Sequence, residues 1–167
     1  IFVIMLTHSE ENYLKTIFHL SLESDKEITT NEIASKMESK PSSVTEMIKK
    51  MSEKSLVYYQ KYKGVSLTDD GQKTALRIIR KHRLWECFLV DKLNFSWDEV
   101  HEIAEQLEHI HSDKLIQELD RFLDYPTHDP HGDPIPNRAG FIQYSEKILL
   151  SELEVGETGR FVGVKDS

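Results

Sequence analysis

The stretch between residues 29 and 68 limits the possible folds of this chain most strongly. Two short amphipathic segments, NEIASKM and SVTEMIKKM, each begin near a Thr or Ser that has a glutamate three residues later, which is the pattern of a helix capping box. Two strand-like segments, LVYYQ and VSLT, follow and are separated by the turn KYKG. A helix predicted from Ser9 to Glu23, with Thr7 and Glu10 as its capping pair, precedes them. Three helices followed by a hairpin predict a winged helix-turn-helix.

A winged helix-turn-helix places its third helix in the major groove of DNA and its hairpin along the DNA backbone. Lysines outnumber glutamates between residues 40 and 63, so this region is locally basic although the whole chain has a net charge of −8. That overall charge argues against binding nucleic acid by electrostatics alone. A three-helix unit could instead recognise another protein. The residues expected to contact DNA are Ser42, Ser43, Thr45, Glu46 and Lys49 of the third helix and Lys61, Tyr62 and Lys63 of the hairpin tip.

A stripe of imidazoles and carboxylates marks a second region, from Ser96 to Ser112. Read as one helix capped by Ser96 and Glu99, this segment places four potential metal ligands on one face and apolar residues on another. Such a polar stripe is costly to pack without a cation, but it could also be a solvated charged face. The four potential ligands are His101, Glu105, Glu108 and His109.

A long helix is predicted to begin near Asp70 and to continue through KHRLWECFLVDKL. His82 and Glu86 stand four residues apart in it, so both side chains can reach one ion. Such a pair is often an incidental surface contact, and it gains weight from the stripe that follows. Cys87 lies one residue off this face and is expected to pack in the core. The two helices together predict a metal centre.

The remainder of the chain predicts one more helix, a loop and the beginning of a further unit. The helix covers residues 112–124, and the segment THDPHGDPIPN after it is rich in Pro, Gly and Asp. His128, Asp129 and His131 are possible additional ligands in this loop. A strand-like RFVGV near the end suggests the opening of a small β domain that too few residues remain to complete. The predicted domains are 5–76 for DNA binding, 77–143 for metal binding and dimerisation, and 144–167 for the incomplete β unit.

Composition restricts where such a protein works. The single cysteine excludes an intrachain disulfide framework and fits a reducing cytoplasm. No apolar run approaches the length of a membrane span, and residues 1–6 lack the basic flank of a secretion signal. Met5 could be the natural start. We therefore expect a cytoplasmic protein that binds no membrane.

Several blocks in the same order resemble the diphtheria-toxin-repressor family of metal-dependent transcriptional repressors, and within it the manganese transport regulators. The blocks are EENYLKTI, PSSVTEMIKKM, VYYQKYKGVSLTDDG, KHRLWECFL, VHEIAEQLEHIHSD and HGDPIP. The resemblance implies a mainly α fold with an N-terminal winged helix-turn-helix, a helical dimerisation domain and a C-terminal SH3-like domain, of which this chain has only the start. It also implies a homodimer that binds a double-stranded DNA operator.

The resemblance further implies two metal positions per subunit. One maps to His82, Glu86 and His101. The other maps to Glu105, Glu108 and His109, completed by Asn12 of the first helix, where the family usually has Met or Asp. The iron-responsive branch has a cysteine at the position of Glu105, and a carboxylate there suits Mn²⁺ better than a thiolate would, without excluding Fe²⁺.

These expectations combine into a hypothesis. The chain is expected to be a repressor that senses Mn²⁺, with Fe²⁺ as the alternative, and controls genes of metal uptake. Metal would tie the first helix to the helices that carry the ligands and fix the recognition helices of the dimer for DNA. Two alternatives stay open. One is a metal-independent winged-helix regulator, and the other is a di-metal carboxylate enzyme in a helical bundle. The chain contains no nucleophile–base set or phosphate-binding loop that would favour an enzyme.

Overall fold

The computed structural model describes residues 6–23, 27–143 and 150–158. The chain divides into two compact units, one of Ile1–Ile79 with Arg138–Gly140 and one of Arg80–Asn137 with Phe141–Ser167. The proposed start at Met5 and the strand RFVGV lie outside the described residues. Among residues 150–158 the structure has a short 3-10 turn, Leu150–Glu152. No helix of the described part is both long enough and apolar enough to cross a membrane.

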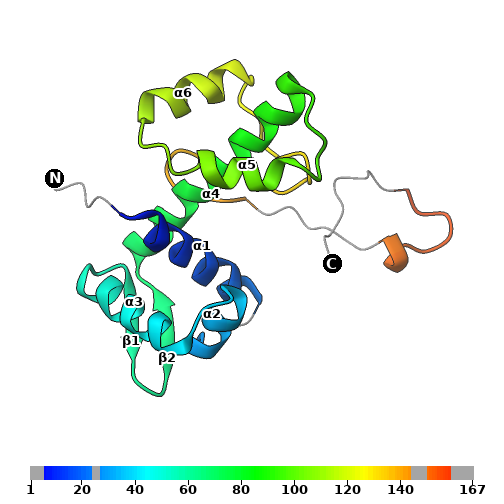
Figure 1. The fold of residues 1–167 in the computed structure, drawn as a ribbon. Coiled ribbons are helices and arrows are strands. Elements are labelled where there is room, and N and C mark those ends of the chain that lie inside the picture. The colour runs from blue at the N-terminus through cyan, green and yellow to red at the C-terminus, as the bar shows by residue number, and fades with distance from the viewer. Residues whose placement is uncertain (1–5, 24–26, 144–149, 159–167) are drawn as a thin grey trace. The chain divides into compact units, whose positions relative to one another are not determined.

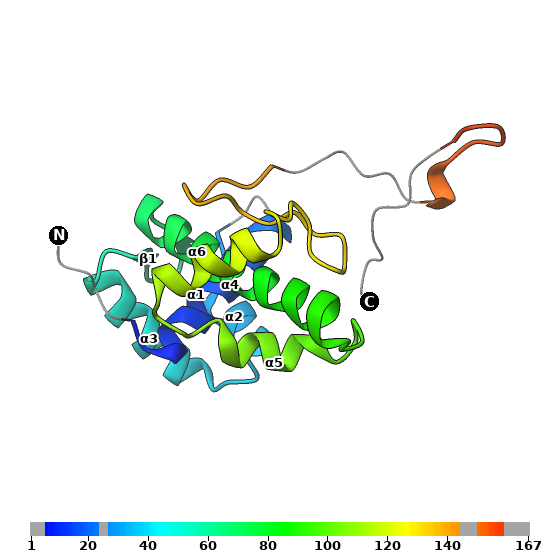
Figure 2. The same ribbon diagram turned by 90° about the horizontal axis from the view of Figure 1, so that it is seen from above.

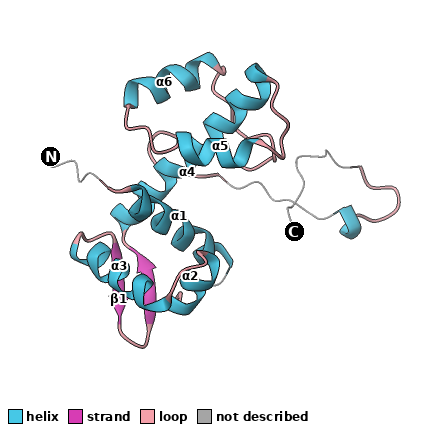
Figure 3. Ribbon diagram, in the orientation of Figure 1, coloured by secondary structure: helices cyan, strands magenta, loops and turns pink. Residues whose placement is uncertain are grey.

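The first unit is a three-helix bundle with a hairpin (Figures 1 and 3). Its elements are α1 (His8–Glu23), α2 (Thr30–Lys36), α3 (Pro41–Glu53), β1 (Val57–Gln60) and β2 (Gly64–Leu67). The strands pair antiparallel, with Val57 opposite Leu67 and Gln60 opposite Gly64. The core consists of the predicted apolar stripes of the helices together with strand residues: Leu14, Ile17, Ile33, Val44, Ile48, Met51, Val57 and Val65 are all buried. The helix-turn-helix with a two-stranded hairpin is therefore confirmed.

The capping boxes predicted for α1 and α2 are present, but the one predicted for α3 is wrong. Thr29 and Glu32 exchange both hydrogen bonds of a capping box at the start of α2. Helix α3 begins at Pro41, two residues before the predicted cap Ser43, and its N-cap Lys40 makes no side-chain capping bond. Proline at the first helical position needs no capping of its own amide and has the helical φ already. Glu46 instead pairs with Lys49 on the exposed side of the helix.

The second unit contains the C-terminal part of α4 (Asp69–Leu93), α5 (Val100–Leu107) and α6 (Asp113–Phe122) (Figure 2). These helices and the loop after α6 pack around one buried core. The core consists of Leu84, Trp85, Leu89, Val100, Ala104, Leu119 and Ile135. Ser112 caps α6 by accepting a hydrogen bond from the Leu115 amide at 3.3 Å. The unit therefore builds one core from three helices and a loop.

The prediction of one helix from Ser96 to Ser112 is wrong at both ends. The backbone and side chain of Ser96 do bond to Glu99, but they close a separate turn, and α5 begins only at Val100. The helix ends at Leu107, with Glu108 as its C-cap residue. Glu108 is fully buried, because its carboxylate is used inside the unit rather than on an exposed helical face. Of the predicted stripe, His101 and Glu105 lie within α5, and Glu108 and His109 follow its last residue.

Candidate metal centre

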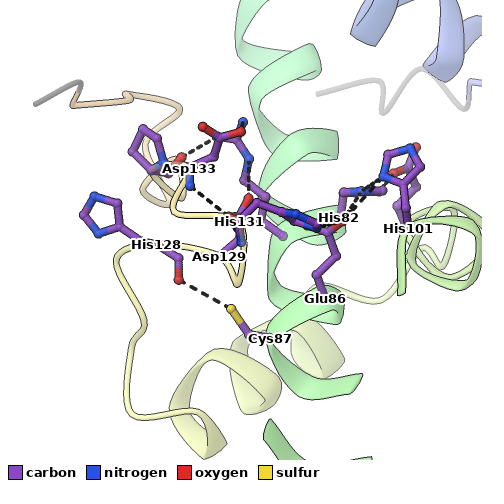
Figure 4. Close-up of polar contacts among 11 residues, drawn as sticks. His82, Glu86, Cys87, His101, His128, Asp129, His131 and Asp133 are labelled. Atoms are coloured by element: carbon purple, nitrogen blue, oxygen red, sulfur yellow. Dashed lines mark hydrogen bonds and ion pairs between the residues drawn. The ribbon is translucent and has the colours of Figure 1, made fainter. Parts of the chain in front are cut away.

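His82, Glu86 and His101 form a compact group of ligand atoms, hereafter the His82 cluster (Figure 4). His82 and Glu86 lie one turn apart on α4, and His101 comes from the first turn of α5. His82 Nε2 is 3.0 Å from Glu86 Oε1 and 3.2 Å from His101 Nδ1. His101 Nδ1 is 3.5 Å from the same Glu86 oxygen. All the ligand atoms lie within 4.8 Å of one another, so one ion could contact all three side chains.

The electrostatics of the His82 cluster suit a cation. His82 and Glu86 are buried, whereas the side chain of His101 is 65% exposed and gives access from solvent. Burial alone would raise the pKa of Glu86, but hydrogen bonds with His101 and His82 outweigh burial and hold its pKa at about 2. Glu86 is therefore a carboxylate anion at neutral pH, held beside two imidazoles in a mostly dry site.

The second predicted ligand set of Glu105, Glu108 and His109 is arranged differently. Glu108 Oε2 lies 2.6 Å from Nδ1 of His82, and Glu108 Oε1 lies 4.0 Å from His109 Nε2. Glu108 therefore contacts His82 of the cluster and also lies near His109. Glu105 is half-buried and, within the described residues, is not part of the compact metal-ligating group.

Asn12, the residue expected to complete the second set, belongs to the first unit. Its side-chain oxygen Oδ1 is buried and has no hydrogen-bond partner in the described part of the chain. A buried amide oxygen without a partner is energetically costly.

The loop from Thr127 to Asn137 is fixed to α4 by Arg83. The guanidinium of Arg83 donates to the carbonyl oxygen of Pro134 and lies 3.3 Å from Asp129 Oδ2. Asp129 also accepts hydrogen bonds from the backbone amides of His131 and Asp133, at 2.9 and 2.8 Å. Burial raises the pKa of Asp129, against the lowering effect of the Asp133 amide and Arg83. Asp129 therefore shapes the loop and is not a member of the His82 cluster.

His131 is the loop side chain that approaches the cluster. Its Nε2 lies 3.7 Å from Glu86 Oε1, and its ring meets the ring edge of Trp97 with the centroids 5.8 Å apart. In Figure 4 the loop with Asp129 and His131 reaches α4 from the side opposite His101. His131 thus adds a third imidazole next to Glu86.

Two neighbouring residues do not approach the site. The thiol of Cys87 is buried and contacts the backbone oxygen of His128 at 3.6 Å, as expected for a residue packed in the core. Burial, followed by the charges of Asp129, Asp91 and Glu86, raises the pKa of Cys87 to about 12. The ring of His128 is exposed and bonds to Thr127 at 3.0 Å. Neither residue offers an atom to the His82 cluster.

The residues predicted to contact DNA lie on the surface of the first unit. On α3, Ser42, Ser43, Glu46 and Lys49 are exposed, and Thr45 is half-buried with its hydroxyl bonded to Pro41 O. Lys61, Tyr62 and Lys63 form the exposed turn of the hairpin. Tyr62 is 93% exposed, and the Lys61 ammonium lies 4.9 Å from the centre of its ring. A cation and an aromatic ring at the tip of a hairpin suit contact with a phosphate backbone.

Sequence reasoning missed two organising residues. Arg83 anchors the loop but appeared only as one more basic residue of α4. The sequence predicts Glu108 as a ligand of the second set and gives no indication of its contact with His82. The sequence does contain a signal for the role of Arg83. The loop after α6 has two aspartates, which need a cation nearby, and Arg83 lies next to His82 in the chain. No comparable signal pointed from Glu108 to His82, 26 residues earlier in the chain.

A helix-turn-helix unit with a hairpin, followed by a helical unit with a compact group of potential metal ligands, is the arrangement expected of metal-responsive DNA-binding regulators. Two family models match the chain, the N-terminal DNA-binding domain of iron-dependent repressors over residues 5–65 and their metal-binding and dimerisation domain over residues 68–137. The chain belongs to this family of iron-dependent repressors, which includes the diphtheria toxin repressors. The family consists of DNA-binding transcriptional repressors, not enzymes.

Individual relatives support the same family membership. An uncharacterised helix-turn-helix regulator of Methanocaldococcus jannaschii is 35% identical over 119 residues, 71% of this chain and 95% of the relative. The iron-dependent repressor IdeR of Mycobacterium leprae is 34% identical over 131 residues, 78% of this chain but only 56% of IdeR. A manganese-dependent transcriptional repressor solved with manganese has a TM-score of 0.78 and 39% identity, covering 87% of this chain and 66% of that chain. This chain thus spans between half and two thirds of the length of the last two relatives.

Proposed function

We propose that this chain senses a divalent transition metal through the His82 cluster and represses transcription by binding DNA through its winged helix-turn-helix. The observation that carries the proposal is the cluster itself. A metal bound at about 2.1 Å in tetrahedral geometry has ligand atoms separated by about 3.4 Å. The three distances within the cluster are 3.0, 3.2 and 3.5 Å, so a cation could bind with little rearrangement.

His131 is a candidate fourth ligand. Its Nε2 lies 3.7 Å from Glu86 Oε1, and the loop that carries it is held in place by Arg83. Three imidazoles and one carboxylate suit Zn²⁺ and Fe²⁺ better than Mn²⁺, because nitrogen-rich sites favour borderline ions. The second ligand set, with Glu105 and Glu108, is richer in oxygen and suits Mn²⁺. We assign the manganese response to the second set, and Fe²⁺ is the alternative effector.

Repression would follow from a difference in metal affinity between two states of the protein. A bound cation neutralises part of the negative charge of the acidic chain, and only an ion that binds the DNA-competent state more tightly can raise DNA affinity. Helix α4 runs without a break from the first unit into the second, so the two activities share one element.

A homodimer is the proposed assembly. The second unit has an apolar hollow of about 650 Å³ on its surface. It is lined by Trp85 and Phe88 of α4 and by Leu115, Leu119 and Phe122 of α6. Phe122 is 62% exposed there, and large exposed aromatic side chains typically become buried in oligomer interfaces. Two subunits would present two recognition helices to successive major grooves of an operator.

A gel-shift titration tests the proposed function. Duplexes would first be selected from a random library with manganese-loaded protein, and their affinity would then be measured with Mn²⁺, Fe²⁺ or a chelator. We expect at least about a tenfold gain from metal, within the usual range of allosteric coupling. His101→Ala should reduce the gain from Fe²⁺, Glu105→Ala with His109→Ala should reduce the gain from Mn²⁺, and the exposed His111→Ala should preserve both. An equal DNA affinity with metal and with chelator would refute metal sensing and support the alternative hypothesis of a metal-independent regulator.

A further inference from the structure

Trp97 is a large aromatic side chain that stays 53% exposed while its ring packs against a residue of the metal centre. The indole and the imidazole of His131 meet edge to face, with their centroids 5.8 Å apart and their planes at 79°. Nε2 of His131 lies 3.7 Å from Oε1 of Glu86. Trp97 therefore contacts the side chain that brings a third imidazole to Glu86.

The backbone brings both rings to this contact. Trp97 lies in the turn between α4 and α5. In that turn the Ser96 amide donates to the Glu99 carboxylate at 3.2 Å, and the Glu99 amide donates to the Ser96 carbonyl oxygen at 3.1 Å. In the loop after α6, the amide of His131 donates to the Asp129 carboxylate at 2.9 Å. Each ring is thus carried by a segment that closes on itself through its own hydrogen bonds.

A fixed loop does not by itself fix the imidazole of His131. The ring can still turn about two side-chain bonds, and its 3.7 Å distance to Glu86 is too long for a hydrogen bond. Packing against a second aromatic ring restricts that rotation, because an edge-to-face pair is lost when either ring turns away. The orientation that the contact with Trp97 maintains has Nε2 on the side of Glu86, where a ligand atom is needed.

We propose that Trp97 is a positioning residue that holds His131 ready as the fourth ligand of the His82 cluster. Without Trp97 the imidazole would become ordered only when an ion binds. Ordering one flexible side chain on binding typically weakens affinity by about 2- to 12-fold. This inference rests on the proposed metal binding and names the residue that makes His131 available to it.

The competing explanation is that the contact between Trp97 and His131 only stabilises the two segments that carry the rings. Replacing Trp97 would then lower the free energy of unfolding, while the metal affinity of the folded chain would stay constant. The experiment must therefore report whether His131 binds metal, together with metal affinity and stability.

The test uses the full chain labelled with ¹⁵N-histidine and titrated with Zn²⁺, a diamagnetic ion. Trp97→Ala removes the ring, Trp97→Leu keeps apolar bulk without an aromatic ring, and Trp97→Phe keeps an aromatic ring. Leu93→Ala is the matched control, because it removes a side chain that is 51% exposed at the end of α4. The ¹⁵N spectrum shows which histidine nitrogens bind zinc, calorimetry gives the affinity, and urea unfolding gives the stability.

In the unmodified chain we expect Zn²⁺ to shift the Nε2 signal of His131 as well as the signals of His82 and His101. Trp97→Ala and Trp97→Leu should weaken zinc binding by about 2- to 12-fold and reduce the shift at His131, while the shift at His82 persists. Trp97→Phe should restore most of the affinity, which a general defect of the fold would not allow. Leu93→Ala should leave the zinc affinity unchanged.

Three results would overturn the inference and leave the proposed function intact. The first is a His131 signal that zinc does not change in the unmodified chain. The second is an equal zinc affinity in the unmodified chain and in Trp97→Ala, and the third is a Trp97→Phe variant that binds zinc as weakly as Trp97→Ala. A chain that binds neither Zn²⁺ nor Mn²⁺ would instead refute the proposed function itself.

Discussion

Glu10 ties α1 to the end of α3, and its replacement by glutamine is the sharpest test of how the first unit is held together. Glu10 is fully buried. Its Oε1 accepts a hydrogen bond from Lys54 at 2.7 Å and lies 3.3 Å from Lys50. Its Oε2 accepts from the Thr7 amide at 2.9 Å. One carboxylate therefore caps α1 and contacts two cations at the end of α3.

The size of the effect can be worked from these contacts. Burial by itself would raise the pKa of Glu10, but Lys54, the Thr7 amide and Lys50 outweigh it and bring the pKa from 4.5 to about 2. A shift of that size corresponds to at most about 3 kcal/mol. The side chains of Lys50 and Lys54 are 51% and 27% exposed, so water screens them. We therefore expect Glu10→Gln to lower the free energy of unfolding by about 1–2 kcal/mol at pH 7.

The stabilising contribution of Glu10 depends on pH in a predictable direction. Because the folded-state pKa of Glu10 is depressed, its stabilising contribution is complete above about pH 4.5 and is lost as the pH falls towards about 2. The difference between the unmodified chain and Glu10→Gln should shrink over the same interval. Urea unfolding followed by circular dichroism, with hydrogen exchange of the α3 amides to isolate the first unit, measures it.

The matched control is Glu46→Gln. Glu46 also pairs with a lysine of α3, at 2.9 Å, but both side chains are more than half exposed. Exposed pairs of this kind contribute little to stability. Equal losses for the two variants, or a difference that stays constant between pH 5 and pH 2, would refute the reasoning.

Two further predictions concern Cys87 and the hairpin tip. The pKa of the Cys87 thiol is about 12, against an ordinary value of 9.0, so the fraction of thiolate is about a thousandfold smaller. We expect iodoacetamide at pH 8 to modify Cys87 only after the chain unfolds, because the thiolate is the reactive form. Mass spectrometry measures the modification. Rapid alkylation of the native chain would contradict this. Lys61→Ala and Lys63→Ala should each weaken binding to all duplexes and reduce the salt dependence by about one counterion, whereas Lys114→Ala on α6 should change neither. Unchanged salt slopes would remove the hairpin tip from the DNA-binding surface.

The elements that the sequence predicted well are those whose signals are local. The capping box of Thr29 and Glu32 and the periodic apolar residues of α3 need only their own neighbours to act. The pair of His82 and Glu86 is local too, since four residues bring two side chains to the same side of any helix. These features follow from chain geometry alone.

The features that sequence reasoning missed depend on tertiary burial. Helix α5 ends at Leu107, and no short-range signal reports that the next residue, Glu108, contacts His82. The same holds for Glu10, whose partner Lys54 lies 44 residues away. A buried carboxylate needs its cations, but the sequence offers many lysines and does not say which of them is near. The membership of His131 in the site was similarly open, because loop composition does not fix loop geometry.

The anchoring of the loop by Arg83 has a thermodynamic consequence. Ordering a free loop costs about 1–2 kcal/mol for each residue that is fixed. In this chain Arg83 binds the loop at Pro134 and Asp129, and Arg80 binds it again at Pro136. That entropy is therefore lost when the protein folds, before any ion arrives. An ion that reaches His131 would meet a side chain already in place, so its binding free energy would remain available for changing the affinity for DNA.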